Sequence, residues 1–127
     1  MDERISFITH QGQKIMVIDF RGCTPQEILP RVDEVQQLVS RHARNSLLTL
    51  VDMAGAHIDR AAATRIKEVL VLDRPYVKRS AWVGTDALPK VYLDNFKSFS
   101  QRQFAHFESR EAAMDWLVKE DPASQTK

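Results

Sequence analysis

The stretch that decides the fold of this 127-residue chain is SLLTLVDM, residues 46–53. It is almost continuously apolar, and it carries an aspartate, Asp52, near its end. Runs of this length and composition are typical of an internal strand in a parallel sheet, where both faces of the strand are covered. We therefore place residues 46–53 at the centre of the predicted fold.

The segment that follows this strand predicts a helix. Asp59 is a residue type that caps helix starts, and apolar residues then recur at helical spacing through Leu72. Pro75 prevents the helix from continuing, because proline lacks the amide proton and its ring clashes with the preceding turn. A strand followed by a helix in this way is the repeating unit of an α/β domain.

Toward the N-terminus, the sequence predicts a hairpin and a further helix. Alternating apolar residues flank the turn signal at residues 11–13, which indicates two antiparallel strands. The helix is expected from about Pro25 to about Ala43. Thr24 and Glu27 have the spacing of a capping box, and Pro25 stands at the first helical position.

Toward the C-terminus, the pattern of strand and helix continues. We expect a strand at residues 77–84, a helix at 88–100, a short strand at 103–107 and a helix at 109–119 that Ser109 caps. Residues 120–127 are small, polar and interrupted by a proline, so we expect a flexible tail after a single domain of residues 1–119. The predicted order is ββαβαβαβα, a mixed sheet of five strands with four helices.

Charge and cysteine content restrict the function. Eighteen basic and 17 acidic residues give a net charge of +1, so we expect neither a nucleic-acid partner nor attraction to an anionic membrane. The single cysteine, Cys23, closes no internal disulfide and forms no cysteine-rich zinc site. No apolar run approaches membrane-spanning length and the start MDERISFI has no signal core, so we expect a cytoplasmic protein with no integral membrane segment.

The central strand also carries a family resemblance. The string from Leu48 to Asp59, LTLVDMAGAHID, resembles the strand–aspartate–loop–aspartate–helix signature of STAS domains, which are named for sulphate transporters and anti-sigma factor antagonists. The chain is most similar to the stand-alone bacterial SpoIIAA-like proteins of that superfamily, which are often grouped with CRAL-TRIO lipid-binding folds. The other matching pieces are IDF at 18–20, CTP at 23–25 with Glu27, RPYVK at 74–78, SAWVG at 80–84, FE at 107–108 and AAMDWL at 112–117.

The resemblance implies a STAS-like fold, but one position departs from its regulatory chemistry. In the anti-sigma factor antagonists, two serines follow the second aspartate, and a kinase-type partner phosphorylates the second serine. Here Asp59 is followed by Arg60 and Ala61, so alanine stands where that phosphorylated serine would be. Alanine has no hydroxyl to accept a phosphoryl group. We therefore expect a domain that lacks the usual serine phosphoswitch.

The loop after the central strand is the first candidate site. An imidazole, His57, lies in sequence between the carboxylates Asp52 and Asp59, a set that suits acid–base chemistry or half of a metal site. The structural interpretation is the stronger one: Asp52 ties the loop, Asp59 caps the helix and His57 faces water. Cys23 has no histidine base in a recognisable arrangement and is expected to be a core residue. No glycine-rich loop or third ligand accompanies these residues, so we predict no cofactor and no metal.

The predicted helix at residues 88–100 is the second candidate site. Tyr92, Phe96 and Phe99 lie on one apolar stripe whose width favours an edge left over for a partner, a second copy of the chain or a lipid tail. Arg74, Lys78 and Arg79 form a local basic connection, for which a solvated surface is the preferred interpretation.

The sequence therefore predicts a non-enzymatic module that binds a protein partner or a small, apolar or lipid-like ligand. The binding residues would be Asp52, His57, Asp59 and Arg60 in the loop, and Tyr92, Phe96 and Phe99 on the helix. Dimerisation through this helix is a further expectation. The alternative is a small acid–base enzyme or hydrolase that uses Asp52, His57 and Asp59.

Overall fold

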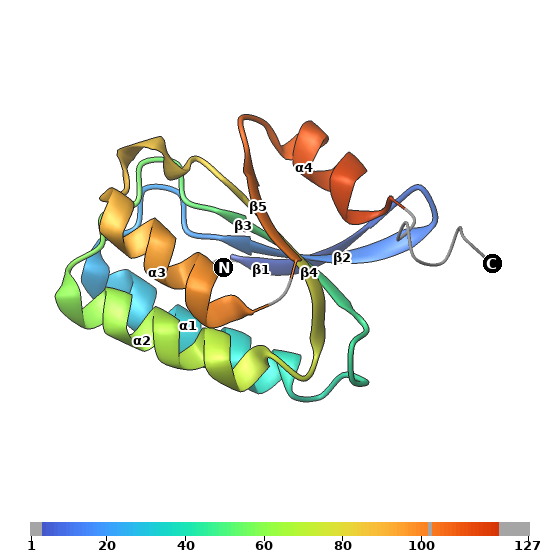
Figure 1. Ribbon diagram of the computed structural model, residues 1–127, viewed down its shortest axis with the longest axis horizontal. Helices are drawn as coiled ribbons and strands as arrows, with labels where there is room; N and C mark the ends of the chain where they lie inside the picture. Colours follow the sequence, from blue (N-terminus) through green and yellow to red (C-terminus); the bar gives the residue numbers. More distant parts are fainter. Residues whose placement is uncertain (1–3, 102, 120–127) are drawn as a thin grey trace.

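The computed structural model describes residues 4–101 and 103–119, which form a five-stranded mixed sheet with helices on both faces (Figure 1). The strands are β1 (Ile5–His10), β2 (Gln13–Asp19), β3 (Leu47–Asp52), β4 (Val77–Val83) and β5 (Gln103–Phe107); the helices are α1 (Pro25–Val39), α2 (Arg60–Asp73), α3 (Lys90–Ser100) and α4 (Arg110–Leu117), with a 3₁₀ turn at Thr85–Ala87. This confirms the predicted α/β class and the order ββαβαβαβα. The tail expected at residues 120–127 lies outside the described residues.

The strands follow one another across the sheet in chain order, β1-β2-β3-β4-β5. The tight hairpin makes β1 antiparallel to β2, whereas β2, β3, β4 and β5 run parallel because a helix connects each to the next. Every residue of β3 is buried, as expected for the apolar run at the centre of the sheet. The carboxyl ends of β2 and β3 therefore lie side by side, with Asp19 paired in register with Asp52.

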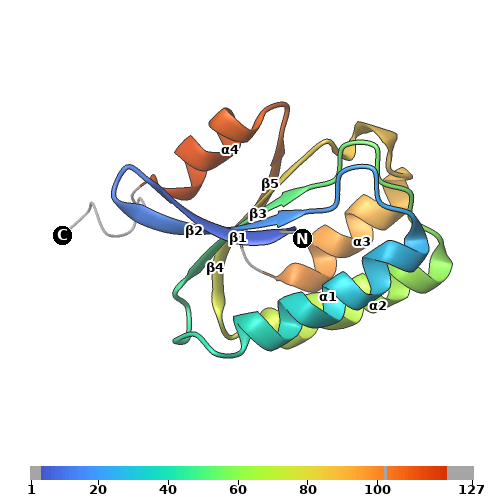
Figure 2. The same cartoon turned by 180° about the vertical axis from the view of Figure 1, so that it is seen from behind.

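The helices form two unequal layers. Helices α1, α2 and α3 cover one face of the sheet, and α4 alone lies on the other, as the two opposite views show (Figures 1 and 2). Helices α1, α2 and α3 connect neighbouring parallel strands in one direction across the sheet. Because such connections are right-handed, all three helices lie on the same face. Helix α4 follows the last strand and is free to pack on the opposite face. Two buried clusters result: a large one under α1, α2 and α3, and a smaller one under α4.

The predicted caps of α1, α2 and α4 are confirmed, whereas the boundaries of α1 and α3 are among those that differ from the prediction. The Thr24 hydroxyl accepts the amide of Glu27 while the Glu27 carboxylate accepts the amide of Thr24, which completes the capping box of α1. This helix ends at Val39 rather than near Ala43, because Ser40 stops it and its hydroxyl donates to the carbonyl of Gln37. Helix α3 begins at Lys90 rather than at residue 88, after the 3₁₀ turn and Pro89.

Candidate functional site: the strand-end cluster and the core cavity

Asp52 is committed to structural bonds at the end of β3. Its side chain is buried; Oδ1 accepts the amide of Ala54 at 3.1 Å and Oδ2 accepts Nε of Arg110 at 2.8 Å. The first bond fixes the loop after β3, and the second fixes the start of α4. Asp52 thus ties the loop as expected, and its partner 58 residues away was not visible in the sequence.

The predicted acid–base set of Asp52, His57 and Asp59 does not assemble. The Asp59 carboxylate caps α2 by accepting the amide of Ala62 at 2.8 Å. His57 is exposed; its backbone amide donates to the carbonyl of Cys23 at 2.9 Å, and within residues 4–101 and 103–119 its ring contacts neither carboxylate. In the same part of the chain, no group of three or more His, Cys, Asp or Glu residues could hold a metal ion. The hydrolase alternative thus loses the geometry on which it depended.

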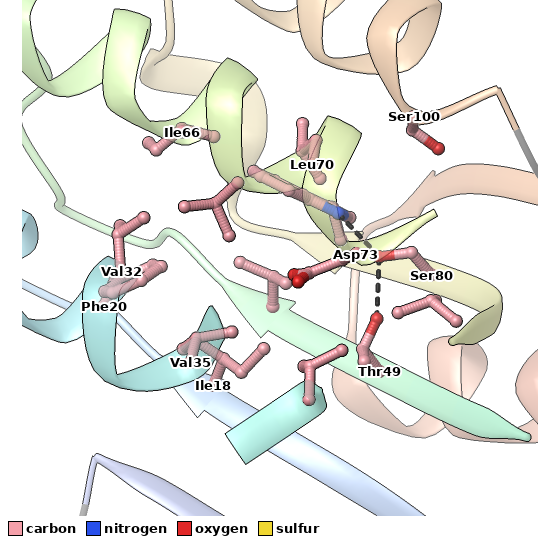
Figure 3. Close-up of a pocket in the computed structure, with 15 residues that line it drawn as sticks. Ile18, Phe20, Val32, Val35, Thr49, Ile66, Leu70, Asp73, Ser80 and Ser100 are labelled. Atoms are coloured by element: carbon pink, nitrogen blue, oxygen red, sulfur yellow. Dashed lines mark hydrogen bonds between the residues drawn. The ribbon is translucent and has the colours of Figure 1, made fainter. Parts of the chain in front are cut away.

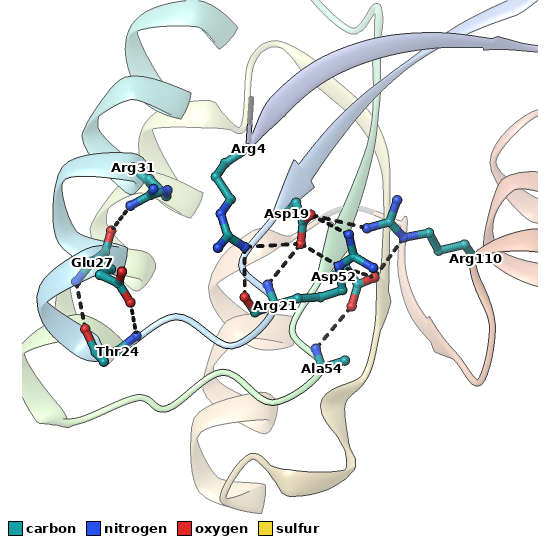
Figure 4. A network of polar contacts seen from close by, with 9 residues as sticks. All are labelled: Arg4, Asp19, Arg21, Thr24, Glu27, Arg31, Asp52, Ala54 and Arg110. Carbon is teal, nitrogen blue, oxygen red and sulfur yellow. Dashed lines mark hydrogen bonds and ion pairs between the residues drawn. The ribbon is translucent and has the colours of Figure 1, made fainter. Parts of the chain in front are cut away.

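The carboxylates at the ends of β2 and β3 belong instead to an arginine cluster (Figure 4). Arg21 donates two hydrogen bonds to the Asp19 carboxylate, from Nε at 3.0 Å and from a terminal guanidinium nitrogen at 2.9 Å. Arg110 lies 3.7 Å from Asp19 as well as 2.8 Å from Asp52, and Arg4 lies 3.7 Å from Asp19. These strand-end contacts join β2, β3 and α4. Sequence reasoning missed the cluster because its arginines come from three distant segments.

Charge pairing shifts the titration of this cluster. Burial acts to raise the pKa of Asp19, but the hydrogen bonds from Arg21 and the charges of Arg21 and Arg110 outweigh it, so that this pKa is lowered. The bond to Asp19 correspondingly raises the pKa of Arg21. Both groups therefore stay charged at neutral pH. The ion pairs of Asp19 with Arg21 and Arg110 are therefore better suited to holding the strand ends together than to transferring a proton.

Cys23 is buried at the start of α1, in the large core cluster. Burial raises the pKa of its thiol, which outweighs the nearby positive charges of Arg4 and Arg31. A thiol that is buried and protonated is a poor nucleophile. Its position fits the core role that the sequence suggested.

The apolar stripe predicted on the third helix divides between the core and the surface. Phe96 is fully buried, and its ring packs 5.5 Å from that of Trp82. Tyr92 is half-buried, whereas Phe99 is 39% exposed and has the Lys67 ammonium 5.4 Å from its ring centroid. Phe96 therefore faces the sheet while Phe99 faces outward, so Tyr92, Phe96 and Phe99 do not share one exposed surface.

The predicted basic connection also separates into different environments. Arg79 is buried under α4, where its guanidinium donates to the carbonyls of Trp116 and Lys119 at the helix end and lies 5.6 Å from the Trp116 ring centroid. Arg74 donates to the carbonyl of Phe99 at 2.8 Å, and Lys78 is exposed. These cations therefore do not form one surface patch. The alternation of β4 explains the difference, because successive side chains point to opposite faces.

A cavity of about 60 Å³ lies between the sheet and the α1–α2 layer (Figure 3). Its wall is mostly aliphatic and aromatic, and its residues come from β2 and the residue after it, β3, β4, α1, α2 and the end of α3. The residues that line it are Ile18, Phe20, Val32, Val35, Val39, Thr49, Val51, Ile66, Val69, Leu70, Asp73, Val77, Ser80, Trp82 and Ser100. An apolar 150 Å³ cavity holds benzene, so this one takes a chain end or a molecule of a few heavy atoms.

One end of the cavity is polar. The hydroxyls of Thr49 and Ser80, which are register partners on β3 and β4, are hydrogen-bonded at 2.9 Å. The indole N–H of Trp82 donates to the same Ser80 oxygen at 3.0 Å. Asp73 and Ser100 stand in the wall nearby, and both are buried (Figure 3). This polar end escaped sequence reasoning, because the apolar appearance of SLLTLVDM concealed a threonine that faces the helices.

Comparison with known proteins supports the fold. The structure matches the crystal structure of an uncharacterised DUF3478-family protein with a SpoIIAA-like fold from Shewanella loihica PV-4, with a TM-score of 0.71 and 18% sequence identity over 90% of this chain and 92% of that one. The chain thus has the SpoIIAA-like fold that its sequence resembles. No protein-family model and no curated protein matches the sequence. Among the described residues, no helix is both long and apolar enough to cross a membrane.

Proposed function

We propose that this protein is a non-enzymatic, cytoplasmic binding module that holds a small apolar or lipid-like ligand in the cavity between its sheet and the α1–α2 layer. The cavity itself is the observation that carries the proposal. Well-packed interiors leave few voids larger than a water molecule. An opening of about 60 Å³ with a mostly apolar wall is therefore a feature that a ligand explains.

The chemistry of the remaining candidate groups supports binding rather than catalysis. The carboxylates of Asp52 and Asp59 are engaged with Arg110 and with the amide of Ala62. Cys23 is buried with a raised thiol pKa. Ala61, at the position that matches the phosphorylated serine of anti-sigma factor antagonists, carries no hydroxyl. The module is therefore proposed to act without a phosphoswitch at that position.

Trp82 provides a direct test, because its ring lines the cavity while the second tryptophan of the chain, Trp116, packs with Phe107 under α4. Nitrogen-15 NMR resolves the two indole signals, and Trp116→Phe assigns them. Titration with pentane is expected to shift the Trp82 signal and to leave the Trp116 signal in place. Native mass spectrometry of protein purified without detergent or solvent should, in addition, detect a bound apolar molecule.

Two matched substitutions on α2 locate the binding. Val69 lines the cavity and is buried, whereas Val71 is 36% exposed outside it. Val69→Leu is expected to reduce the pentane-induced shift by partly filling the cavity, and Val71→Leu is expected to leave it unchanged. Equal behaviour of the two variants, or no response of Trp82 in the wild type, would reject the proposed function.

The loop after β3 supports a second candidate function, docking of a protein partner. His57, Asp59, Arg60 and Ala61 are all exposed on this loop and at the start of α2. The loop is also held rigidly, because Asp52 bonds the Ala54 amide and a Cβ at Gly84 would lie only 2.4 Å from the Ala54 nitrogen. Pull-down from a lysate with wild type and Arg60→Glu separates the candidates: a partner docked here is lost with Arg60→Glu, while pentane binding is retained.

A further inference from the structure

The polar end of the cavity has one hydroxyl proton that the hydrogen bonds among its side chains do not use. Thr49, Ser80 and Trp82 contribute two O–H groups and one N–H group. Only two hydrogen bonds join these groups, and the Ser80 hydroxyl takes part in both. If Thr49 donates to Ser80, the Ser80 proton is left over; if the bond between the hydroxyls runs the other way, the Thr49 proton is left over. Among the described residues, no acceptor takes this third proton.

This spare donor is deeply buried and lies in the cavity wall. Thr49 is 4% exposed and Ser80 5% exposed, and both line the cavity. A hydroxyl that is taken out of water without a partner is unfavourable, so an acceptor in the cavity is stabilised by it. In Figure 3, both hydroxyls stand together on β3 and β4 beside Asp73, and aliphatic side chains of α1 and α2 line the space beyond them. The arrangement therefore selects an occupant with an oxygen at one end and an apolar body.

The lining of the cavity restricts the occupant further. Among the described residues, no lysine or arginine lines it. A ligand carboxylate would enter a poorly solvated space without a cation to pair with, which disfavours it. A neutral oxygen, such as that of a ketone, ester or aldehyde, has no such penalty.

We propose that the cavity binds the carbonyl end of a small neutral apolar molecule, with the spare hydroxyl proton of the Thr49–Ser80 pair donated to the carbonyl oxygen. The inference rests on the proposed function, since it assigns chemistry to the same cavity. It adds that binding is directional: the oxygen lies against β3 and β4, and the apolar part lies among the aliphatic side chains of α1 and α2.

The test uses a pair of probes that differ mainly in one atom group. Butan-2-one carries a carbonyl where 2-methylbut-1-ene, of nearly the same shape, carries a methylidene group. Both are titrated into the full chain, and the dissociation constants are read from the broadening of each probe's own proton NMR signals. The variant Thr49→Val/Ser80→Ala/Trp82→Phe removes both hydroxyls together with the indole N–H, which would otherwise lose its acceptor on Ser80 and donate to the ketone. This triple variant is expected to weaken butan-2-one binding about fivefold while binding of the alkene is unchanged or tighter.

Single variants make the donor count itself testable. Thr49→Val leaves the Ser80 proton without a partner, so butan-2-one should still bind about as well as to the wild type. Thr85→Val is the matched control, because Thr85 is a buried threonine outside the cavity wall. Circular dichroism of each variant confirms that it is folded before it is titrated.

The outcomes separate the two proposals. If both probes bind but the triple variant weakens neither or weakens both equally, the carbonyl assignment is wrong, water satisfies the hydroxyl, and the apolar cavity stands. If neither probe binds and pentane does not shift the Trp82 signal, both proposals fail. Selective weakening of butan-2-one binding in the triple variant supports the carbonyl assignment.

Discussion

Compared with the face of the sheet under α1, α2 and α3, the face under α4 is covered by one helix of eight residues. The three-helix face is held by a large apolar cluster and still encloses a cavity. The α4 face has a smaller apolar cluster and polar ties at both ends of its helix: Arg110 to Asp52 at the start, and Arg79 to the carbonyls at the end. The two faces therefore differ in packing: the three-helix face leaves a cavity, whereas polar side chains bond both ends of the helix on the α4 face.

The largest test of this difference is removal of the apolar anchor of α4. Leu117 is 1% exposed in the α4 cluster, and Leu117→Ala is expected to lower the free energy of unfolding by about 3 kcal/mol, because burial is lost and a void remains. Urea denaturation measures the loss. Leu72→Ala on α2, where Leu72 is 49% exposed, is the control and should change stability by less than about 0.5 kcal/mol. A loss below about 1 kcal/mol for Leu117→Ala would show that α4 is not an essential layer.

The second test breaks the tie at the end of α4. Arg79→Met keeps an unbranched apolar stem but removes the charged donor to the carbonyls of Trp116 and Lys119. We expect a loss of about 2 kcal/mol in urea denaturation, as for hydrogen bonds made by charged groups. Lys78→Met, at the exposed neighbouring position, should have little effect. Equal losses for the two variants would mean that the buried guanidinium contributes no stability beyond its stem.

The third test adds one methylene group to each face. Val17 and Val51 are equally buried on neighbouring strands, but Val51 lines the cavity and Val17 packs under α4. Val17→Ile is expected to destabilise the protein by about 1 kcal/mol through overpacking. Val51→Ile should be neutral or slightly stabilising, because its extra group enters existing space. Thermal and urea unfolding measured side by side decide the comparison; a larger loss for Val51→Ile would mean that the cavity does not accept added volume.

Much of the fold was predictable because its signals are local. Three examples are the continuous apolar run of β3, the Thr24–Glu27 capping box and the Asp59 cap. Each depends only on residues that are close together in the sequence. Such signals fix the type of each element and its order along the chain. The helix boundaries were less accurate, because the end of α1 depends on the Ser40 cap rather than on the apolar period.

The candidate site was less predictable because its contacts are distant in sequence. Asp52 was expected to be structural, but its partner Arg110 is 58 residues away. In the sequence, Arg79 resembles a surface cation beside Lys78. Its burial under α4 depends on the pairing of β4 with its neighbours and on the position of α4, which the sequence around it does not indicate. The cavity arises because the sheet and the helices on one of its faces do not fill the space between them. No single segment encodes that volume, although the alternation of β3 places Thr49 on the same face as Val51.

The smallest expected effect concerns Asp19, which helps to tie the start of α4 to the strand ends. Because the ion pairs with Arg21 and Arg110 outweigh burial and lower the pKa of Asp19, its contribution to stability is fully present above the unfolded-state value near 3.8 and is lost as the pH falls through the folded-state pKa. Asp19→Asn should therefore be less stable than the wild type by up to about 1 kcal/mol near neutral pH, with the difference vanishing in strong acid. Urea denaturation over this pH range measures it, with Asp94→Asn, on the exposed side of α3, as the control for net charge. If the stability difference between Asp19→Asn and the wild type instead persists in acid, the Asp19 side chain stabilises the fold through contacts that do not depend on its charge.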